Sequence, residues 1–325
     1  MARAAEDVLA RLDERRMIIV EHLAAARAPL GPGDPITLGL DRRGHTPALD
    51  AAAFDLLLTT APDAPAPWIS SPDLDLDASA LSEAVALNPI AAAILIDTLR
   101  LGAGLGFDAA LWVESLAYST LLGGAAFRRW RAGHRGQGRV PVRDPVRLER
   151  QDDRLEIVLD DPASRNALSA GMRDALVEAL TLPLLDPGIR TVTLQGAGPA
   201  FSSGGHLDEF GSAGDLAAAH QVRTGQSVAR LMHALGPRLV TRVHGHAVGG
   251  GLEIAAASAR LEAKPGTRFH LPEVAMGLIP GAGGTASLPR RIGRHRTAFL
   301  ALTGRTIDVE TALAWGLIDA LWSDA

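Results

Sequence analysis

The 325-residue sequence contains no cysteine, and this absence excludes several kinds of chemistry. Without a thiol there is no disulfide, no thiolate metal site and no cysteine nucleophile. The absence is compatible with a reducing compartment, so we expect a cytoplasmic protein. An excess of positive charge is also missing. The net charge of −5 argues against a nucleic-acid-binding protein, because such proteins carry basic surfaces.

A long uninterrupted apolar run is missing too. The most apolar stretch, residues 84–101, is broken by Asn88, Pro89, Asp97 and Arg100, which predicts a buried helix rather than a membrane span. The N-terminus is charged and amphipathic and does not have the pattern of a signal peptide. Hydrophobic residues make up 47% of the chain, enough for a sizeable core. We therefore expect a soluble globular protein.

Several common site motifs are absent as well. The glycines at 281–285 are not followed by the Lys-Ser/Thr of a nucleotide P-loop, and no Gly-x-Ser-x-Gly nucleophile elbow occurs. His244 and His246 alternate on an extended segment and could bind a metal, but no third ligand is evident. We therefore expect no metal site.

The first 135 residues predict a mainly helical region. Apolar residues recur at helical spacing, with one strand expected at 36–41 and helices at 3–27, 49–58, 78–87, 90–101 and 108–132. Residues 136–150 are rich in Gly, Pro and Arg and are expected to form a linker. Eight arginines lie from Arg128 to Arg150, and they fit either a phosphate-binding patch or a solvated surface.

From residue 151 to the end, the pattern changes to alternating strands and helices. Strands are expected at 155–159, 191–194 and 239–244, and helices at 169–180 and 217–235. Such alternation favours an α/β fold with largely parallel strands. Residues 36–58 also align without gaps on residues 155–177 with seven identities, for which an internal repeat and chance are comparable explanations.

Three segments of this second half carry candidate chemistry. Residues 201–206 and 248–253 are glycine-rich, and glycine lets the backbone approach a ligand closely. The second segment enters a helix, where unpaired N–H groups suit an anionic oxygen, although a tight strand–helix turn explains the glycines as well. Glu253 lies in the first turn of that helix, and Glu273 follows a proline between apolar neighbours. A desolvated carboxyl group has a raised pKa and can donate a proton near neutral pH.

With these segments in view, residues 151–323 resemble the crotonase superfamily, also called the enoyl-CoA hydratase/isomerase family. The resemblance rests on linked motifs in a consistent order, at residues 161–168, 193–207, 244–253, 269–285, 302–308 and 312–318. It implies a spiral of ββα turns that binds an acyl-CoA thioester. Coenzyme A would be part of the substrate, and no separate cofactor is expected.

The resemblance also implies roles for individual residues. The N–H groups of Gly205 and Gly250 would form the oxyanion hole, Glu253 would activate water, and Glu273 would deliver a proton to the α-carbon. The implied reaction is hydration of a 2,3-enoyl-CoA or the reverse dehydration, because family branches that isomerise or cleave often keep only one of the two glutamates. The substrate-binding residues expected by position are Arg165, Ala167, Ser203, His206, Leu207 and Gly281.

The sequence departs from the family pattern at several points. His206 stands where an aspartate is usual, and Asp208 stands where a lysine often helps to hold the CoA phosphates, for which Arg165 could substitute. The family normally continues past the position of Ala325 with helices that cover the acyl pocket and build a trimer. Residues 76–131 resemble those helices, as a circular permutation or a collapsed tandem copy would produce.

The alternatives to hydration are an isomerase, a lyase or a cofactor-free oxygenase on the same scaffold, and a non-catalytic acyl-CoA-binding protein. By the habit of the family, we expect a homo-oligomer, either a trimer or a hexamer.

Overall fold

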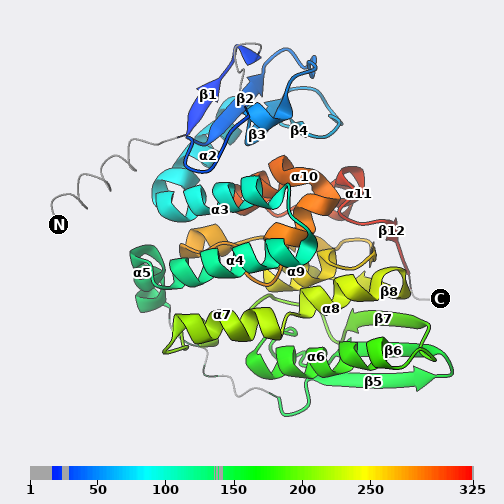
Figure 1. Ribbon diagram of the computed structural model, residues 1–325. Helices are drawn as coiled ribbons and strands as arrows, with labels where there is room; N and C mark the ends of the chain where they lie inside the picture. Colours follow the sequence, from blue (N-terminus) through cyan, green and yellow to red (C-terminus); the bar gives the residue numbers. More distant parts are fainter. Residues whose placement is uncertain (1–16, 24–28, 135, 137, 139–141, 324–325) are drawn as a thin grey trace.

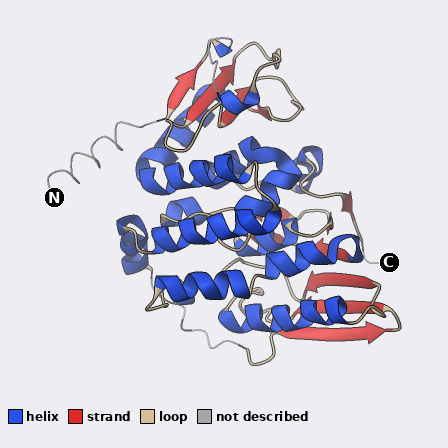
Figure 2. Ribbon diagram, viewed as in Figure 1, coloured by secondary structure: helices blue, strands red, loops and turns tan. Residues whose placement is uncertain are grey.

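Two sheets lie towards opposite ends of the molecule, with stacked helices between them (Figure 1, Figure 2). The computed structural model describes residues 17–23, 29–134, 136, 138 and 142–323. Helices and strands mix throughout, which confirms the predicted α/β class.

The second half of the chain is a spiral of repeated turns. Its six-stranded sheet has the order β12-β10-β8-β7-β6-β5, and only β5 runs antiparallel to its neighbour. The strands are β5 (Val146–Gln151), β6 (Arg154–Leu159), β7 (Thr191–Gly196), β8 (Leu239–Val243), β10 (Arg260–Ala263) and β12 (Ala320–Leu321).

After each inner strand the chain crosses a second, smaller layer before it enters a helix. That layer contains the bridges Leu168–Gly205 and Ser202–Ala247 and the parallel pair β9 (His246–Val248) with β11 (Arg268–His270). The helices are α6 (Ala170–Leu185), α7 (Leu216–Gly225), α8 (Val228–Leu235), α9 (Gly250–Ala256), α10 (Gly284–Thr303) and α11 (Val309–Trp315). This order of elements is the expected ββα spiral.

The first half of the chain contains a second parallel sheet as well as helices. Its strands are β1 (Ile18–Val20), β2 (Thr37–Asp41), β3 (Leu56–Thr59) and β4 (Ile69–Ser70), in that spatial order. Four helices follow: α2 (Leu74–Leu87), α3 (Pro89–Gly102), α4 (Phe107–Leu122) and α5 (Ala125–Gly133). The region expected to be mainly helical therefore combines a parallel sheet with helices.

Several predicted elements differ from the structure. The helix predicted at 49–58 is wrong: only Ala51–Ala53 form a 3-10 turn, and residues 56–59 are β3, whose side chains are buried on both faces. A strand that is buried on both faces lacks the alternating pattern and is easily mistaken for a helix. The predicted repeat sets strand β2 against strand β6 but sets β3 against the interior of α6, so the second part of the gap-free alignment has no structural counterpart.

The predicted helices 108–132 and 217–235 are each broken in two. Gly123–Gly124 separate α4 from α5, and Gln226–Ser227 separate α7 from α8. The helix expected at 3–27 lies mostly outside the described residues, and residues 18–20 within it form β1. The expected linker, 136–150, runs into β5, so its last residues are part of the core sheet.

The apolar stretch 84–101 lies in α2 and α3, which meet at Asn88–Pro89. No single described helix is long and apolar enough to cross a membrane; α2 and α3 together meet that criterion, but they are bent by 108°.

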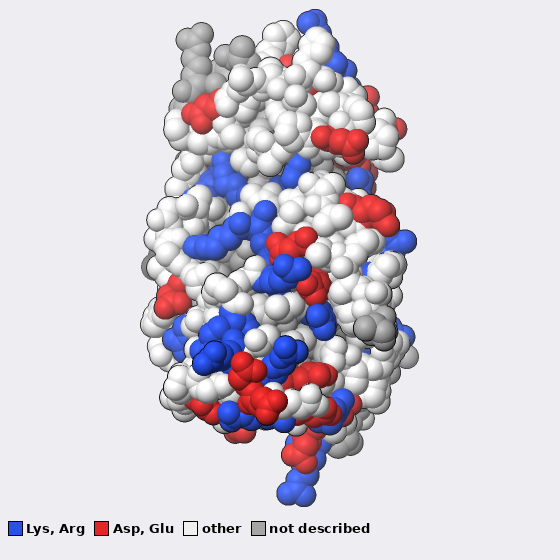
Figure 3. All heavy atoms as spheres, turned by 90° about the vertical axis from the view of Figure 1, so that its right-hand side faces the viewer, with Lys and Arg blue, Asp and Glu red and all other residues white. Residues whose placement is uncertain are grey.

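Charges are interspersed on the face seen in Figure 3, where basic and acidic side chains lie next to one another. Arginines from the 128–150 stretch take part in such pairs: Arg147 lies 3.6 Å from Asp160, and Arg150 lies 2.7 Å from Asp186. These pairs fit the solvated-surface interpretation of that stretch.

One hydrophobic core spans both halves of the chain, from Ile36 to Ile318. A buried ion-pair network adds to the contact between the N-terminal sheet and α10. The carboxylate of Asp55, 1% exposed, pairs with Arg100 at 2.6 Å and with Arg294 at 3.2 Å. It also accepts the N–H of Thr37 at 2.9 Å. Asp55 therefore links β2, α3 and α10.

Replacing Asp55 by alanine should destabilise the whole chain. The change leaves Arg294 without its carboxylate partner among the described residues and leaves Arg100 with Asp97 alone, at 3.2 Å. Breaking a buried pair in this way typically costs about 3–5 kcal/mol. The measurement is the free energy of unfolding in a denaturant titration. Asp174→Ala, which removes an exposed carboxylate, is the control and should change little. An equal response of the two variants would contradict this account of the network.

Candidate active site

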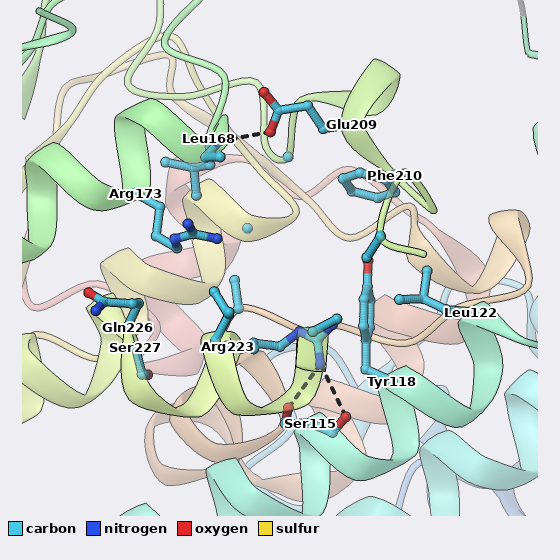
Figure 4. A pocket seen from close by; sticks show the side chains of 18 of the residues that line it. Ser115, Tyr118, Leu122, Leu168, Arg173, Glu209, Phe210, Arg223, Gln226 and Ser227 are labelled. Atoms are coloured by element: carbon cyan, nitrogen blue, oxygen red, sulfur yellow. Dashed lines mark hydrogen bonds between the residues drawn. The ribbon is translucent and has the colours of Figure 1, made fainter. Parts of the chain in front are cut away.

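A pocket of about 540 Å³ lies among α4, α6, α7 and the N-terminal ends of α9 and α10 (Figure 4). Both halves of the chain contribute to it: Leu111 and Tyr118 come from α4, and Leu168 and Gly250 come from the spiral. The expected site residues that line this pocket are Gly205, His206, Gly250, Glu253, Glu273 and Gly281.

The N–H groups of Gly205 and Gly250 lie close together at this pocket. A Cβ on Gly250 would sit 3.7 Å from the backbone nitrogen of Gly205. Gly250 is the first residue of α9, where an N–H has no partner within the helix. No described residue accepts a hydrogen bond from either N–H. Two unpaired donors side by side can bind an anionic oxygen.

Gly249 makes room for an acid beside these donors. Its φ of 46° is a conformation that favours glycine, and a Cβ there would collide with Oε1 of Glu273. The glycine triplet therefore serves two purposes: it brings N–H groups to the pocket and allows a carboxyl group to approach the backbone.

Glu253 is 2% exposed and lies in the first turn of α9. Its Oε2 accepts the N–H groups of Ala282 at 2.6 Å and Gly284 at 2.8 Å. Burial raises the pKa of Glu253 to about 7, and these N–H donors act in the opposite direction. Glu253 is therefore able to gain and lose a proton near neutral pH.

Glu273 is 6% exposed and opens the 3-10 turn Glu273–Met276. Its Oε2 is buried and has no hydrogen-bond partner among the described residues. Burial, and then the charge of Glu253, raise the pKa of Glu273 well above its usual value. Burial and the charge of Glu253 therefore favour the protonated, neutral form of Glu273.

A third buried acid, Glu114 of α4, was not singled out in the sequence. It is 2% exposed and accepts the N–H of Gly283, the N–H of Thr285 and the hydroxyl of Thr285, each at 2.7 Å. Burial, and then Glu253, raise the pKa of Glu114 to about 8. A lone glutamate in an apolar helix gives no signal by itself, because its partners lie 169 residues or more along the chain.

The two acids Glu114 and Glu253 share one loop between them. The consecutive N–H groups of residues 282–285 bind Glu253, Glu114, Glu253 and Glu114 in turn. Helix α10 begins at Gly284, so both carboxyl groups also lie at the positive end of its dipole. The orientation of Glu253 therefore depends on α4 as well as on α9 and α10.

Two aromatic side chains form another wall of the pocket. The ring of Tyr118 packs on Gly281, where a Cβ would collide with it, and the ring of Phe210 packs on Gly205 in the same way. Burial raises the pKa of Tyr118, so its hydroxyl keeps its proton. Figure 4 shows both rings on one side of the pocket.

The remaining expected substrate-binding residues do not line the pocket. Arg165 is exposed, Ala167 is buried beneath the surface, and Ser203 donates its hydroxyl to the carbonyl of Ser164 at 2.9 Å. Leu207 begins a 3-10 turn behind His206. The structure thus brings six of the ten expected site residues to the pocket and leaves these four outside it.

The two residues that depart from the family pattern, His206 and Asp208, have different surroundings. Nδ1 of His206 is buried without a partner among the described residues. Asp208 faces the chain that follows α5: its Oδ1 lies 3.3 Å from Nε2 of His134, and its Oδ2 accepts the N–H of Gly138 at 3.1 Å. Asp208 therefore ties the spiral to the N-terminal half.

Across the described ranges, no group of three or more His, Asp or Glu residues is arranged to hold a metal ion. Nε2 of His244 lies 2.9 Å from the carbonyl oxygen of Gly198.

Comparisons with known sequences point to one family. Residues 149–325 match the family model described as enoyl-CoA hydratase/isomerase. The chain is 34% identical over 171 residues to 2,3-dehydroadipyl-CoA hydratase of Escherichia coli (strain K12), covering 53% of this chain and 66% of that protein. It is 34% identical over 175 residues to (E)-benzylidenesuccinyl-CoA hydratase of Thauera aromatica, covering 54% and 68%. The chain thus spans about two thirds of the length of these relatives.

Solved structures agree with the sequence matches. The crystal structure of enoyl-CoA hydratase from Thermoplasma volcanium GSS1 has a TM-score of 0.51 at 29% identity, covering 56% of this chain and 73% of that chain. An enoyl-CoA hydratase/isomerase from Mycobacterium paratuberculosis has a TM-score of 0.52 at 28% identity, covering 56% and 74%.

The buried acids give a testable pH dependence of stability. Glu273 keeps its proton in the folded state above its ordinary pKa of 4.5, whereas the unfolded chain releases it. The wild type should therefore lose stability relative to Glu273→Gln as the pH rises above about 4.5. Denaturant unfolding of both proteins over a pH series measures this difference. Burial lowers the pKa of His295 to about 4, so the titration of His295 has the opposite effect on stability. Because His295 is present in both proteins, its contribution cancels when the wild type is compared with Glu273→Gln.

Glu178→Gln, an exposed change on the outside of α6, is the matched control and should track the wild type at every pH. A stability difference between the wild type and Glu273→Gln that stays constant with pH would contradict a raised pKa at Glu273.

Proposed function

Because the chain belongs to the enoyl-CoA hydratase/isomerase family, we propose that it adds water across the 2,3-double bond of an enoyl-CoA, or removes water in the reverse direction. The observation that carries the proposal is the meeting of two acids and two unpaired N–H groups at one pocket. Glu253 and Glu273 line the same space as Gly205 and Gly250. The names of the relatives, several of which are hydratases of CoA thioesters, support the same reaction.

The N–H groups of Gly205 and Gly250 would bind the thioester oxygen. Addition of water to the β-carbon pushes electrons towards this oxygen, which becomes enolate-like. Donors that already point at this position stabilise the developing charge, and the loss of one such donor typically costs about 3–4 kcal/mol. Gly205 and Gly250 would therefore act on the transition state more than on the bound substrate.

The two glutamates would move the protons. The water oxygen bonds to the β-carbon, and its proton passes to the carboxylate of Glu253. The neutral carboxyl of Glu273 delivers a proton to the α-carbon, so the product is the 3-hydroxyacyl-CoA. The pKa of Glu253, about 7, suits a base at neutral pH, and the raised pKa of Glu273 suits a proton donor.

Helix α4 supports the further proposal that residues 76–131 replace the closing helices of the family. Leu111, Ser115 and Tyr118 of this helix line the pocket, and Glu114 holds the loop that orients Glu253. The acyl site would then be closed by the chain's own N-terminal half. The reaction would use no cofactor beyond the CoA of the substrate, and a cytoplasmic homo-oligomer remains the expected form.

Neutralising either catalytic acid should abolish most of the activity. General acid–base catalysis contributes about 10²–10⁴-fold, so Glu253→Gln and Glu273→Gln should each lower kcat/KM for hydration of trans-2-enoyl-CoA thioesters by about a hundredfold or more. The loss of absorbance of the conjugated thioester measures the rate.

Glu178→Gln is again the control and should keep wild-type rates, since its side chain is exposed and outside the pocket. The hydratase proposal is wrong if neither glutamate substitution lowers the rate of hydration. Binding of acyl-CoA without turnover by the wild type would favour the non-catalytic alternative.

A further inference from the structure

Two arginines line the pocket and have no part in the proposed chemistry. Arg173 reaches it from α6 and Arg223 reaches it from α7. Figure 4 shows the two guanidinium groups entering the same region, and Arg223 lies beside the ring of Tyr118.

Arg223 has only neutral hydrogen-bond partners. Its Nη1 donates to the carbonyl and hydroxyl oxygens of Ser115, at 3.2 and 2.9 Å, and to the hydroxyl of Ser119 at 3.1 Å. Its guanidinium carbon lies 4.6 Å from the centre of the Tyr118 ring. No ion pair among the described residues includes Arg223. The Nε and Nη2 groups of Arg223 have no hydrogen-bond acceptor among the described residues either. The edge of the guanidinium group that carries these two nitrogens is therefore available to a ligand.

The surroundings of Arg223 favour an anion. Burial lowers the pKa of the Arg223 guanidinium. Tyr118 and Glu114 act in the opposite direction, and the positive charge of Arg173 lowers the pKa further. A partly desolvated cation without a counter-ion is unfavourable, and a carboxylate presented to its free edge would remove that cost.

Arg173 adds a second guanidinium to the same region. Its Nε and Nη2 both bind Oδ1 of Asp174, at 2.9 and 2.7 Å, and the carboxylate of Asp174 is 56% exposed. Its Nη1 is not used in this pair. Because Asp174 is well solvated, it screens the charge of Arg173 only in part.

The acids of the pocket do not neutralise the two arginines. Glu209 accepts the N–H of Ala170 at 2.7 Å, and Asp215 caps α7 through the N–H groups of Ala217 and Ala218. Glu114 and Glu253 are held by backbone N–H groups. Within the described part of the chain, none of these carboxylates forms an ion pair with Arg173 or Arg223.

We propose that the pocket takes an acyl chain that ends in a carboxylate, bound by Arg223 with the help of Arg173. The proposal rests on the proposed function only for the thioester end of the ligand. Tyr118 and Phe210 pack along the apolar part of the chain, and the arginines select its charged end. The substrate class is thus the CoA thioester of a dicarboxylic acid.

Calorimetric binding of two saturated thioesters tests this without any turnover. The acyl chains of adipoyl-CoA and hexanoyl-CoA have the same length, and they differ only at the far end. Adipoyl-CoA ends in a carboxylate, whereas hexanoyl-CoA ends in a methyl group. The wild type should bind adipoyl-CoA about tenfold or more tightly than hexanoyl-CoA, because a charge-assisted bidentate contact is strong in a partly buried site. Arg223→Gln and Arg173→Gln should each reduce this preference, and Arg223→Lys should retain part of it.

Arg190→Gln is the matched control, because Arg190 is exposed and does not line the pocket. It should keep the full preference for adipoyl-CoA. If Arg223→Gln does not fold, as a thermal unfolding curve would reveal, the comparison is made with Arg173→Gln. Among the described residues, the hydrogen bonds of the Arg173 side chain all go to Asp174 of its own helix, and none goes to α4.

Free CoA distinguishes the acyl carboxylate from the phosphates of the cofactor moiety. Its affinity should be the same in the wild type and in both glutamine variants. The proposal would be overturned if either glutamine variant bound free CoA more weakly than the wild type does. It would also be overturned if the wild type bound adipoyl-CoA and hexanoyl-CoA equally well. Failure of the wild type to hydrate any enoyl-CoA, with the preference for adipoyl-CoA intact, would count against the proposed function alone.

Discussion

The loop at residues 282–285 is the constraint on which the rest of the site depends. Its four consecutive N–H groups alternate between two buried acids, Glu253 from the spiral and Glu114 from the N-terminal half. The same loop begins α10, the helix whose Arg294 reaches Asp55 beneath the N-terminal sheet. The position of Glu253 is therefore coupled to the packing of both halves of the chain.

Burial and hydrogen bonding together explain why three carboxyl groups can coexist here. Burial raises the pKa of all three, and the N–H donors of the loop favour the charged forms of Glu114 and Glu253. Glu273 has no such donors on Oε2, and burial and the charge of Glu253 together raise its pKa well above the usual value. The environment thus gives chemically identical side chains different surroundings for holding or releasing a proton.

The sequence predicted the spiral and its motifs well, because each turn repeats a strand, a glycine-rich crossing and a helix. It predicted the first half less well. Residues 56–59 form a strand buried on both faces, which lacks the alternation by which a strand is recognised. Glu114 and Arg223 could not be identified, because their significance comes from contacts between distant segments. Arg165, expected at the substrate, lies on the surface outside the pocket.

The central claim is that two acids and two N–H groups add water to a conjugated thioester. Incubating the wild type with a trans-2-enoyl-CoA in D₂O and examining the product by proton NMR tests it most directly. We expect a 3-hydroxyacyl-CoA that carries one deuterium on the α-carbon, since Glu273 would exchange its proton with solvent and deliver a deuteron there. A shifted double bond without a hydroxyl group, or recovery of unchanged substrate, would contradict it.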